Sequence, residues 1–416
     1  MQGRGRFAAP TAWAVSWVAY ATYYMGRKGF SASKKSIHEE LGVSETALGV
    51  IDTTYLGAYA LGQFVSGFLG DRIGARRLVS VGMLLSAAAC AAFGSVSGAL
   101  AFGGLYLLNG FAQSTGWPGT TRAMAEWTTP QNRGTVMAFW ATCYQVGGIA
   151  AGLICAELLG AYGWRSTFFV PAAVMAIVGV LVYLLLRPGP SAAGSEAAAR
   201  AENETPSPEA VAERKAAQRA VLRSGELWSF GASYFFIKFI RYTLLFWLPY
   251  YLATALHYDK VVAQRLSQAF DAGGVIGVIV IGILSDRLRR IPRSQLSAVA
   301  LVGLAVALLI YTKAAHAGLL WNGLALGLVG AMLFAPDSLL SGAAAQDAGG
   351  PHAAAMATGF VNGVGSVGGM ISGLAVPQIS KHLGWDALVP TLVLLAIFSA
   401  FALLPAVIAS RKASAA

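Results

Sequence analysis

GFLGDRIGARR, residues 67–77, interrupts a long apolar region with four charged side chains. The pattern returns in shorter form as GILSDRLRR at residues 282–290, again after an apolar stretch. The 416 residues are 56% apolar and only 12% charged, whereas about a quarter of a typical soluble chain is charged. An apolar helix of about 20 residues is long enough to cross a bilayer. The sequence therefore predicts an all-α membrane protein and excludes a soluble globular enzyme.

The two charged motifs belong to an internal repeat. Asp71 of the first motif corresponds to Asp286 of the second. Two further pairs have nearly the same separation along the chain, VGG at 146–148 with 367–369 and Gly163-Trp164 with Gly384-Trp385. The nearly equal separations indicate one duplicated unit with a small insertion in the second copy. Parallel repeats of this kind form the two halves of secondary transporters, whose substrate site lies between the halves.

The apolar stretches predict twelve transmembrane helices in two pseudo-symmetric bundles of six. The first bundle, residues 1–187, has spans at 9–30, 46–70, 76–96, 99–124, 133–160 and 165–187. The second bundle, residues 225–416, has spans at 226–256, 262–285, 295–313, 317–346, 353–381 and 386–409. Residues 188–224 are rich in Pro, Ser, Ala and Glu, a composition typical of a linker, whose second part has the pattern of an amphipathic surface helix.

The distribution of basic residues predicts the orientation in the membrane. Nineteen Lys and Arg fall on the side that holds both termini and the linker, and seven, Lys34 among them, fall on the other side. By the positive-inside rule the termini and linker are cytoplasmic. We expect a multi-pass protein of the plasma (inner) membrane of a prokaryote. The net charge of +11 then reflects the orientation of the chain in the membrane. We expect the lipid bilayer as a partner, and no nucleic acid.

Several motifs in the correct order give the chain a family resemblance. The 67–77 motif resembles the loop motif of the major facilitator superfamily. YYMGRKGF (23–30), GFAQSTGWPGTTRAMAEW (110–127), RGTVMAFWATCYQVGG (133–148), YGWRSTFFVPA (162–172) and IRYTLLFWLPYYL (240–252) are similar to the organophosphate:phosphate antiporter family. The resemblance implies the major facilitator fold and exchange of inorganic phosphate for an organic phosphate ester such as a sugar phosphate or glycerol phosphate.

The polar positions of the family pattern differ in this chain. Ala141, Tyr144 and Gln145 replace the family's Asn, His and Asn, and Gln63 lies where the glycerol-3-phosphate transporter has a Lys. The resemblance therefore implies a retained framework with a different polar lining. We expect Tyr144, Gln145, Gln63 and Tyr24 to bind substrate, with Asn109, Gln113, Trp117 and Trp140 as further candidates for the lining.

Two arginines within spans are the main candidates for the substrate site. Arg27 in the first span and Arg241 in the seventh are separated along the chain almost as the two loop motifs are, so the repeat predicts equivalent positions facing each other across the pseudo-two-fold axis. An arginine at mid-span costs about 2.5–3.5 kcal/mol on insertion scales. A guanidinium fork matches two phosphate oxygens. The resemblance assigns phosphate binding to these positions, and the alternative is that each arginine pairs with an internal acid to hold helices together.

Two charged residues near Arg241 are candidates for the same site. Lys238 shares a helix face with Arg241, and the alternative is a lysine that snorkels to the interface. We expect Asp271 to balance Arg241 or Lys238 rather than to carry protons. The loop clusters Asp71, Arg72, Arg76, Arg77, Asp286 and Arg287 suit a cytoplasmic gate made of charge pairs that form in one conformation.

These observations predict a secondary transporter that works by alternating access as a monomer, with no enzymatic activity, no cofactor and no metal. Its expected partners are inorganic phosphate and a small phosphate ester. Strict exchange would follow from two unpaired arginines that resist reorientation when empty. The alternatives are a sugar-phosphate sensor of the same family, a proton-coupled importer of organic anions, and a structural or channel-like membrane protein.

Overall fold

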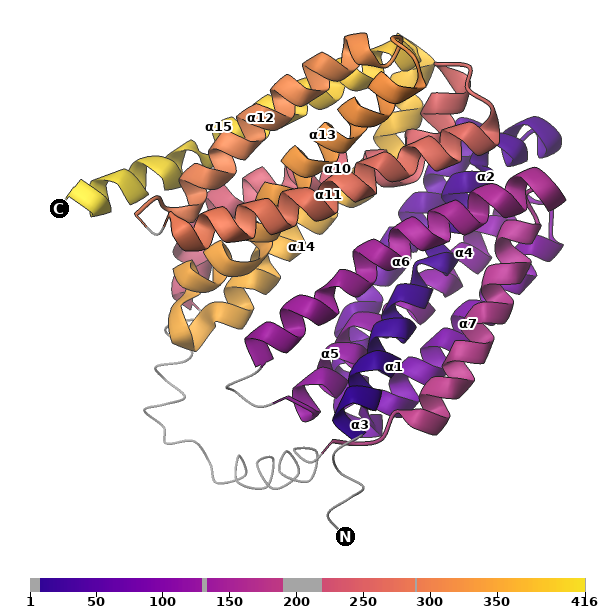
Figure 1. The fold of residues 1–416 in the computed structure, drawn as a ribbon, viewed down its shortest axis with the longest axis horizontal. Coiled ribbons are helices and arrows are strands. Elements are labelled where there is room, and N and C mark those ends of the chain that lie inside the picture. The colour runs from indigo at the N-terminus through magenta and orange to yellow at the C-terminus, as the bar shows by residue number, and fades with distance from the viewer. Residues whose placement is uncertain (1–7, 129–132, 190–218, 289, 416) are drawn as a thin grey trace. The chain divides into compact units, whose positions relative to one another are not determined.

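The computed structural model describes residues 8–128, 133–189, 219–288 and 290–415, and every regular element among them is helical. The first half contains α1 (Ala8–Tyr23), α2 (Met25–Leu41), α3 (Glu45–Ser95), α4 (Ala99–Gln113), α5 (Gly116–Glu126), α6 (Arg133–Tyr162) and α7 (Ser166–Leu185) (Figure 1). The second half contains α10 (Gly225–Thr254), α11 (Lys260–Arg287), α12 (Arg293–Ala314), α13 (Leu319–Ser338), the π-helical η1 (Leu339–Ala343), α14 (Ala344–Leu383), the 3-10 helical η2 (Trp385–Ala387) and α15 (Leu388–Ala415).

Each of the twelve predicted spans coincides with helix, so the twelve-helix prediction is confirmed. Two spans share α3, which bends at Gly74, where φ is 80°, a left-handed value that glycine adopts without steric cost. One span is divided between α1 and α2 at Tyr24, and another between α4 and α5 at Ser114 and Thr115. Pro118 is the third residue of α5, where its missing N–H has no helical partner to lose.

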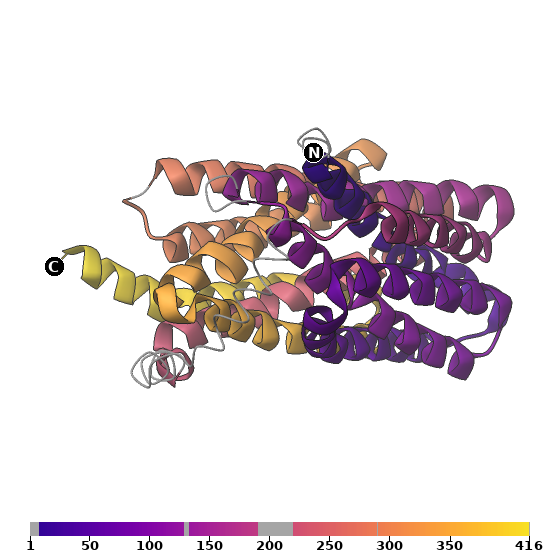
Figure 2. The same ribbon diagram turned by 90° about the horizontal axis from the view of Figure 1, so that it is seen from below.

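The chain forms two compact units. The first consists of residues 1–204 with 258–265, and the second of residues 205–257 with 266–416. Within each unit the helices run alongside one another, as Figure 1 and Figure 2 show. Eight stretches of the described residues are by themselves long and apolar enough to cross a membrane. Most of the predicted linker, residues 190–218, lies outside the described residues.

The repeated VGG motif brings helices into close contact in both units. A Cβ added to Gly147 of α6 would lie 2.5 Å from the Ala21 carbonyl oxygen of α1. In the second unit, a Cβ added to Gly368 of α14 would overlap the Phe235 carbonyl oxygen of α10. Ala21 lies six residues before Arg27, and Phe235 lies six residues before Arg241. Each unit therefore packs the segment that leads into its arginine against its VGG helix in the same way.

We expect Gly368→Ala to lower thermal stability, because the new methyl group meets backbone that cannot rotate away. Overpacking of this kind costs about 1–3 kcal/mol, which thermal unfolding in detergent would show as a clear drop in midpoint. Gly363→Ala is the matched control on α14, since nothing lies within 4 Å of its added Cβ and alanine favours helix. Equal midpoints for the two variants would contradict the close packing.

Candidate functional site

Arg27 lies in the first turn of α2 among three tyrosine rings. Its guanidinium carbon is 4.8 Å from the centroid of Tyr24, 5.0 Å from that of Tyr59 and 6.0 Å from that of Tyr20. Rings at these distances stabilise a cation through their π faces. Its Nε donates to Gln113 Oε1 at 2.7 Å, while its Nη2 is buried without a hydrogen-bond partner. The guanidinium is thus held on one edge and has unused donor capacity on the other.

Gln113 is fixed by a buried network, which decides how it meets Arg27. Its Nε2 donates to the Tyr23 carbonyl oxygen and to Ser86 Oγ, both at 3.0 Å. Ser86 in turn donates to Asn109 Oδ1 at 2.6 Å, and Asn109 Nδ2 donates to the Gly26 carbonyl oxygen at 3.0 Å. Because Nε2 has two acceptors, Oε1 is the atom left to face Arg27. The sequence suggested cavity lining for Asn109 and Gln113, but both are buried and bind the arginine and its backbone instead.

Arg241 lies in α10 and is bonded to a carboxylate. Its Nη1 is 3.0 Å from Asp337 Oδ2, and its guanidinium carbon is 4.8 Å from the Phe334 centroid. The expectation of two unpaired arginines is therefore wrong for Arg241. Asp271, expected to balance Arg241 or Lys238, is buried on α11, and the carboxylate of Asp337 on α13 is hydrogen-bonded to Arg241. The position of Asp337 within its span could not be determined from the sequence, so no role was predicted for it.

Lys238 is buried three residues before Arg241 on α10. Its Nζ donates to Ser366 Oγ at 3.1 Å and to the Asn362 carbonyl oxygen at 3.4 Å, both on α14. The ammonium also lies 5.2 Å from the centroid of Tyr234. A snorkelling lysine would extend toward the interface, whereas this one is 8% exposed and contacts uncharged groups. The second unit thus holds two cations within one turn of α10.

Tyr144, Gln145 and Gln63, which were predicted to bind substrate, are half-buried in the first unit. Tyr144, a residue of α6, packs against the hydrophobic cluster that contains Tyr20. The next residue, Gln145, has a buried Nε2 without a hydrogen-bond partner. Gln63 lies on α3, the helix that carries Tyr59. Trp140 is buried and donates to Ser16 Oγ at 3.1 Å, so it packs rather than lines a cavity. Tyr59 was not singled out from the sequence, although its spacing of four residues from Gln63 on α3 was a usable signal.

The gating residues are described only in part. The side chains of Asp71, Arg72 and Asp286 lie outside those that the structure describes. The guanidinium carbon of Arg76 is 5.2 Å from the Tyr183 centroid, which joins α3 to α7, while Arg77 and Arg287 are exposed. A pair that the sequence did not indicate joins α12 to α14, since Arg293 Nη1 is 2.5 Å from Asp347 Oδ2.

The count of basic residues placed Lys34 on the side of the membrane opposite the termini, but the structure buries it. It lies on α2, two turns beyond Arg27, fully buried and paired with the fully buried Asp52 of α3. The first span therefore extends past residue 30, because α2 continues to Leu41. Asp52 Oδ1 has no hydrogen-bond partner.

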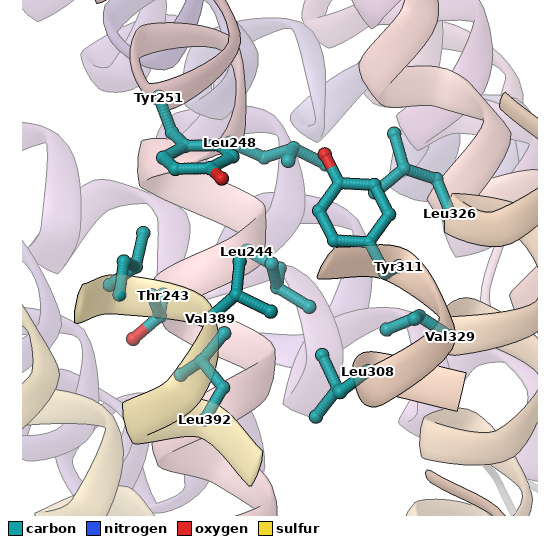
Figure 3. Close-up of a pocket in the computed structure, with 11 residues that line it drawn as sticks. Thr243, Leu244, Leu248, Tyr251, Leu308, Tyr311, Leu326, Val329, Val389 and Leu392 are labelled. Carbon is teal, nitrogen blue, oxygen red and sulfur yellow. The ribbon is translucent and has the colours of Figure 1, made fainter. Parts of the chain in front are cut away.

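A pocket in the second unit lies away from these charges. Figure 3 shows it lined mainly by aliphatic side chains, together with Thr243, Tyr251 and Tyr311. Thr243 is two residues after Arg241 on α10, which places it about 200° around the helix. The pocket thus uses the face of α10 opposite to Arg241. Its lining holds no charged residue, so it does not fit a phosphate.

Comparisons with known proteins identify the family to which the chain belongs. The family model described as Major Facilitator Superfamily matches residues 16–373. Sugar phosphate exchanger 3 of Mus musculus is 30% identical over 376 residues, which cover 81% of this chain and 75% of that protein. Putative glycerol-3-phosphate transporter 2 of Arabidopsis thaliana is 29% identical, over 96% of this chain and 86% of that protein. A probable hexose phosphate transport protein of Chlamydia pneumoniae is 26% identical, over 95% and 90%.

Solved structures agree on the fold. A bacterial homolog of the human lysosomal transporter Spinster superposes with a TM-score of 0.78 over 98% of both chains, at 15% identity. A D-xylose-proton symporter superposes with a TM-score of 0.75 over 95% of this chain and 97% of its own, at 12% identity. At such low identity these likenesses concern the fold alone.

Proposed function

Because the chain belongs to the major facilitator superfamily and, within it, to the organophosphate:phosphate antiporter family, we propose that it exchanges inorganic phosphate for an organic phosphate ester across a membrane. The observation that carries this proposal is Arg27. A half-buried guanidinium with an uncharged partner on Nε and a buried Nη2 without a hydrogen-bond partner is suited to a ligand with several acceptor oxygens. A phosphate monoester carries about 1.5–2 negative charges at pH 7 and supplies those oxygens.

Each unit contributes one arginine to the substrate in this proposal. The matching places of Arg27 and Arg241 in the internal repeat support equivalent roles, as does the shared packing of their helices on the VGG motifs. Lys238 adds a second cation from α10. Tyr24, Tyr144, Gln145 and Gln63 are the polar groups proposed to contact the organic part of the substrate, and Gln145 has a buried donor to offer.

The transport cycle follows from one site that opens to each side in turn. Phosphate binds the arginines, the site closes around it, and the protein opens on the opposite side. Charged contacts at the helix ends, such as Arg293 with Asp347, would hold one closed arrangement and break in the other. We propose that the termini and linker are cytoplasmic, as the excess of basic residues on that side supports, that the membrane is the plasma membrane, and that the protein acts as a monomer without catalysis.

Proteoliposomes test the proposal directly. Uptake of labelled phosphate is measured into vesicles loaded with unlabelled phosphate and into empty vesicles. We expect uptake to be much faster into loaded vesicles, and a panel of triose and sugar phosphates to compete for it. Protease accessibility of a terminal tag measures the orientation of the protein in each vesicle population. This orientation assigns the side on which each substrate acts.

Two other functions predict different results in the same assay. A sugar-phosphate sensor would bind ligand, seen as thermal stabilisation, with little exchange. A proton-coupled importer of organic anions would respond to an imposed pH gradient in vesicles without internal phosphate. Neither exchange nor binding would contradict the proposed substrate class.

Gln113→Glu is expected to weaken phosphate binding more than Gln113→Leu. The glutamate places a carboxylate 2.7 Å from Arg27 Nε, where Gln113 Oε1 now lies, and so neutralises the cation that phosphate needs. Leucine removes the Nε partner but leaves the charge, at a cost of about 1–3 kcal/mol for unsatisfied groups. The half-saturating phosphate concentration of exchange measures the difference. Similar values for Glu and Leu would show that the added negative charge does not affect phosphate binding.

A further inference from the structure

The two arginines are held by partners of opposite character. Arg27 is held by the neutral oxygen of Gln113, whereas Arg241 is held by the carboxylate of Asp337. A carboxylate offers an arginine the same kind of oxygen pair as a phosphoryl group. Asp337 is therefore already in the place, relative to Arg241, that a phosphoryl oxygen would take.

The carboxylate of Asp337 is only partly satisfied. Its Oδ2 is 3.0 Å from Arg241 Nη1, but its Oδ1 is buried without a hydrogen-bond partner. Charged groups buried with unsatisfied atoms are costly. A structural ion pair that only joined α10 to α13 would be expected to use both oxygens. In this pair one carboxylate oxygen has no hydrogen-bond partner. Fewer hydrogen bonds are therefore lost when Arg241 binds another anion in place of Asp337.

The backbone directly after Asp337 departs from an ordinary α-helix. Asp337 is the second-last residue of α13 and follows Pro336, and the π-helical η1 begins two residues later. The Asp337 carbonyl oxygen accepts from Ser341 Oγ at 2.6 Å. Short π-helical segments are frequent at functional sites. The acid thus lies in the last turn of α13, directly before the π-helical segment.

We propose that Asp337 is an internal substitute for the substrate phosphate: it holds Arg241 in the empty transporter and gives the guanidinium up when phosphate arrives. This inference rests on the proposed function. Two consequences follow. Phosphate must compete with Asp337, so the carboxylate weakens apparent affinity. The empty site also carries less uncompensated charge when it closes, so Asp337 lowers the barrier to reorientation without substrate.

Asp337→Asn and Asp337→Glu distinguish this role from a structural one. For Asp337→Asn we expect the half-saturating phosphate concentration of exchange to fall about 10-fold, as for the loss of one competing charge-assisted bond. Net efflux of phosphate from loaded vesicles into phosphate-free medium should fall by a similar factor, with exchange at saturating phosphate within a few-fold of wild type. Asp337→Glu keeps the competing charge, so it should lower the half-saturating concentration less than Asp337→Asn does. A merely structural acid would instead lower exchange and affinity together.

Phosphate binding to the purified proteins, followed as thermal stabilisation, separates this inference from the proposed function. Tighter binding by Asp337→Asn supports the inference even where exchange is slow. Wild-type exchange or binding without any gain in Asp337→Asn, or net efflux that rises in that variant, would overturn the inference and leave the proposed function standing. Wild type that neither exchanges nor binds phosphate would overturn both.

Discussion

Arg27→Lys is expected to reduce phosphate exchange at least about 100-fold, even though the charge is kept. The guanidinium uses Nε for Gln113 and retains a buried Nη2 for the ligand, and an ammonium group cannot serve both directions in one plane. Loss of two charge-assisted hydrogen bonds, each worth about 1.5–3 kcal/mol, corresponds to a factor of this size or larger. Exchange of labelled phosphate in proteoliposomes measures it, at phosphate concentrations high enough to separate affinity from turnover.

The control for Arg27→Lys is Arg165→Lys. Arg165 also lies in the first unit, but its Nη1 donates to the carbonyl oxygens of Gly94 and Val96 and its Nη2 to Ser97 Oγ, which ties together the ends of helices. We expect Arg165→Lys to lower stability slightly and to leave exchange within a few-fold of wild type. Exchange that survives in Arg27→Lys would show that charge alone at residue 27 is enough, and would remove the case for a guanidinium fork.

The buried pair of Lys34 and Asp52 is expected to give the largest effects on stability. Both side chains are fully buried, so Lys34→Met leaves a carboxylate without its cation and Asp52→Leu leaves an ammonium without its anion. Breaking a buried pair in this way costs about 3–5 kcal/mol. We expect each single variant to accumulate poorly and to unfold at a much lower temperature in detergent than wild type.

The double variant Lys34→Met with Asp52→Leu separates the pair from its individual charges. Replacement of a buried ion pair by apolar residues of similar volume is often neutral or stabilising, so the double variant should recover most of the lost stability. Phe30, whose ring centroid lies 5.1 Å from Lys34 Nζ, offers an apolar surface for the new methionine. Additive losses in the double variant would mean that each residue acts through other neighbours.

The sequence predicted the fold well because the signals for membrane helices are strong and repeated. Long apolar stretches indicated all twelve spans, and the VGG motif, which recurs in the second half, corresponded to the same helix packing in both units. The bend at Gly74 lies between two of these predicted spans. The extension of α2 to Leu41 was not predicted, because Lys34 and its neighbours have the composition of a polar loop. Only the structure shows that Asp52 compensates the charge of Lys34.

The site was predicted less completely, because residue type does not reveal which polar groups pair. The two arginines were found through their cost in a membrane and their place in the repeat. Gln113 was found as a polar residue but given the wrong task, since only the structure shows that its amide is bonded on both sides. Asp337 and Asp271 are both acids within apolar stretches, and spacing along the chain did not indicate that Asp337 pairs with Arg241.

The aromatic surroundings of Arg27 also give the protein a built-in optical probe. Tyr20, which lies beneath the guanidinium, is 5.3 Å from the Trp117 centroid and 5.7 Å from that of Trp140. The emission of an indole depends on the electric field across its ring. A dianion that binds Arg27 reverses the sign of the nearest charge felt by these two tryptophans. Intrinsic fluorescence can therefore follow occupancy of the first unit in unlabelled protein, with Trp117→Phe and Trp140→Phe identifying the source of the signal.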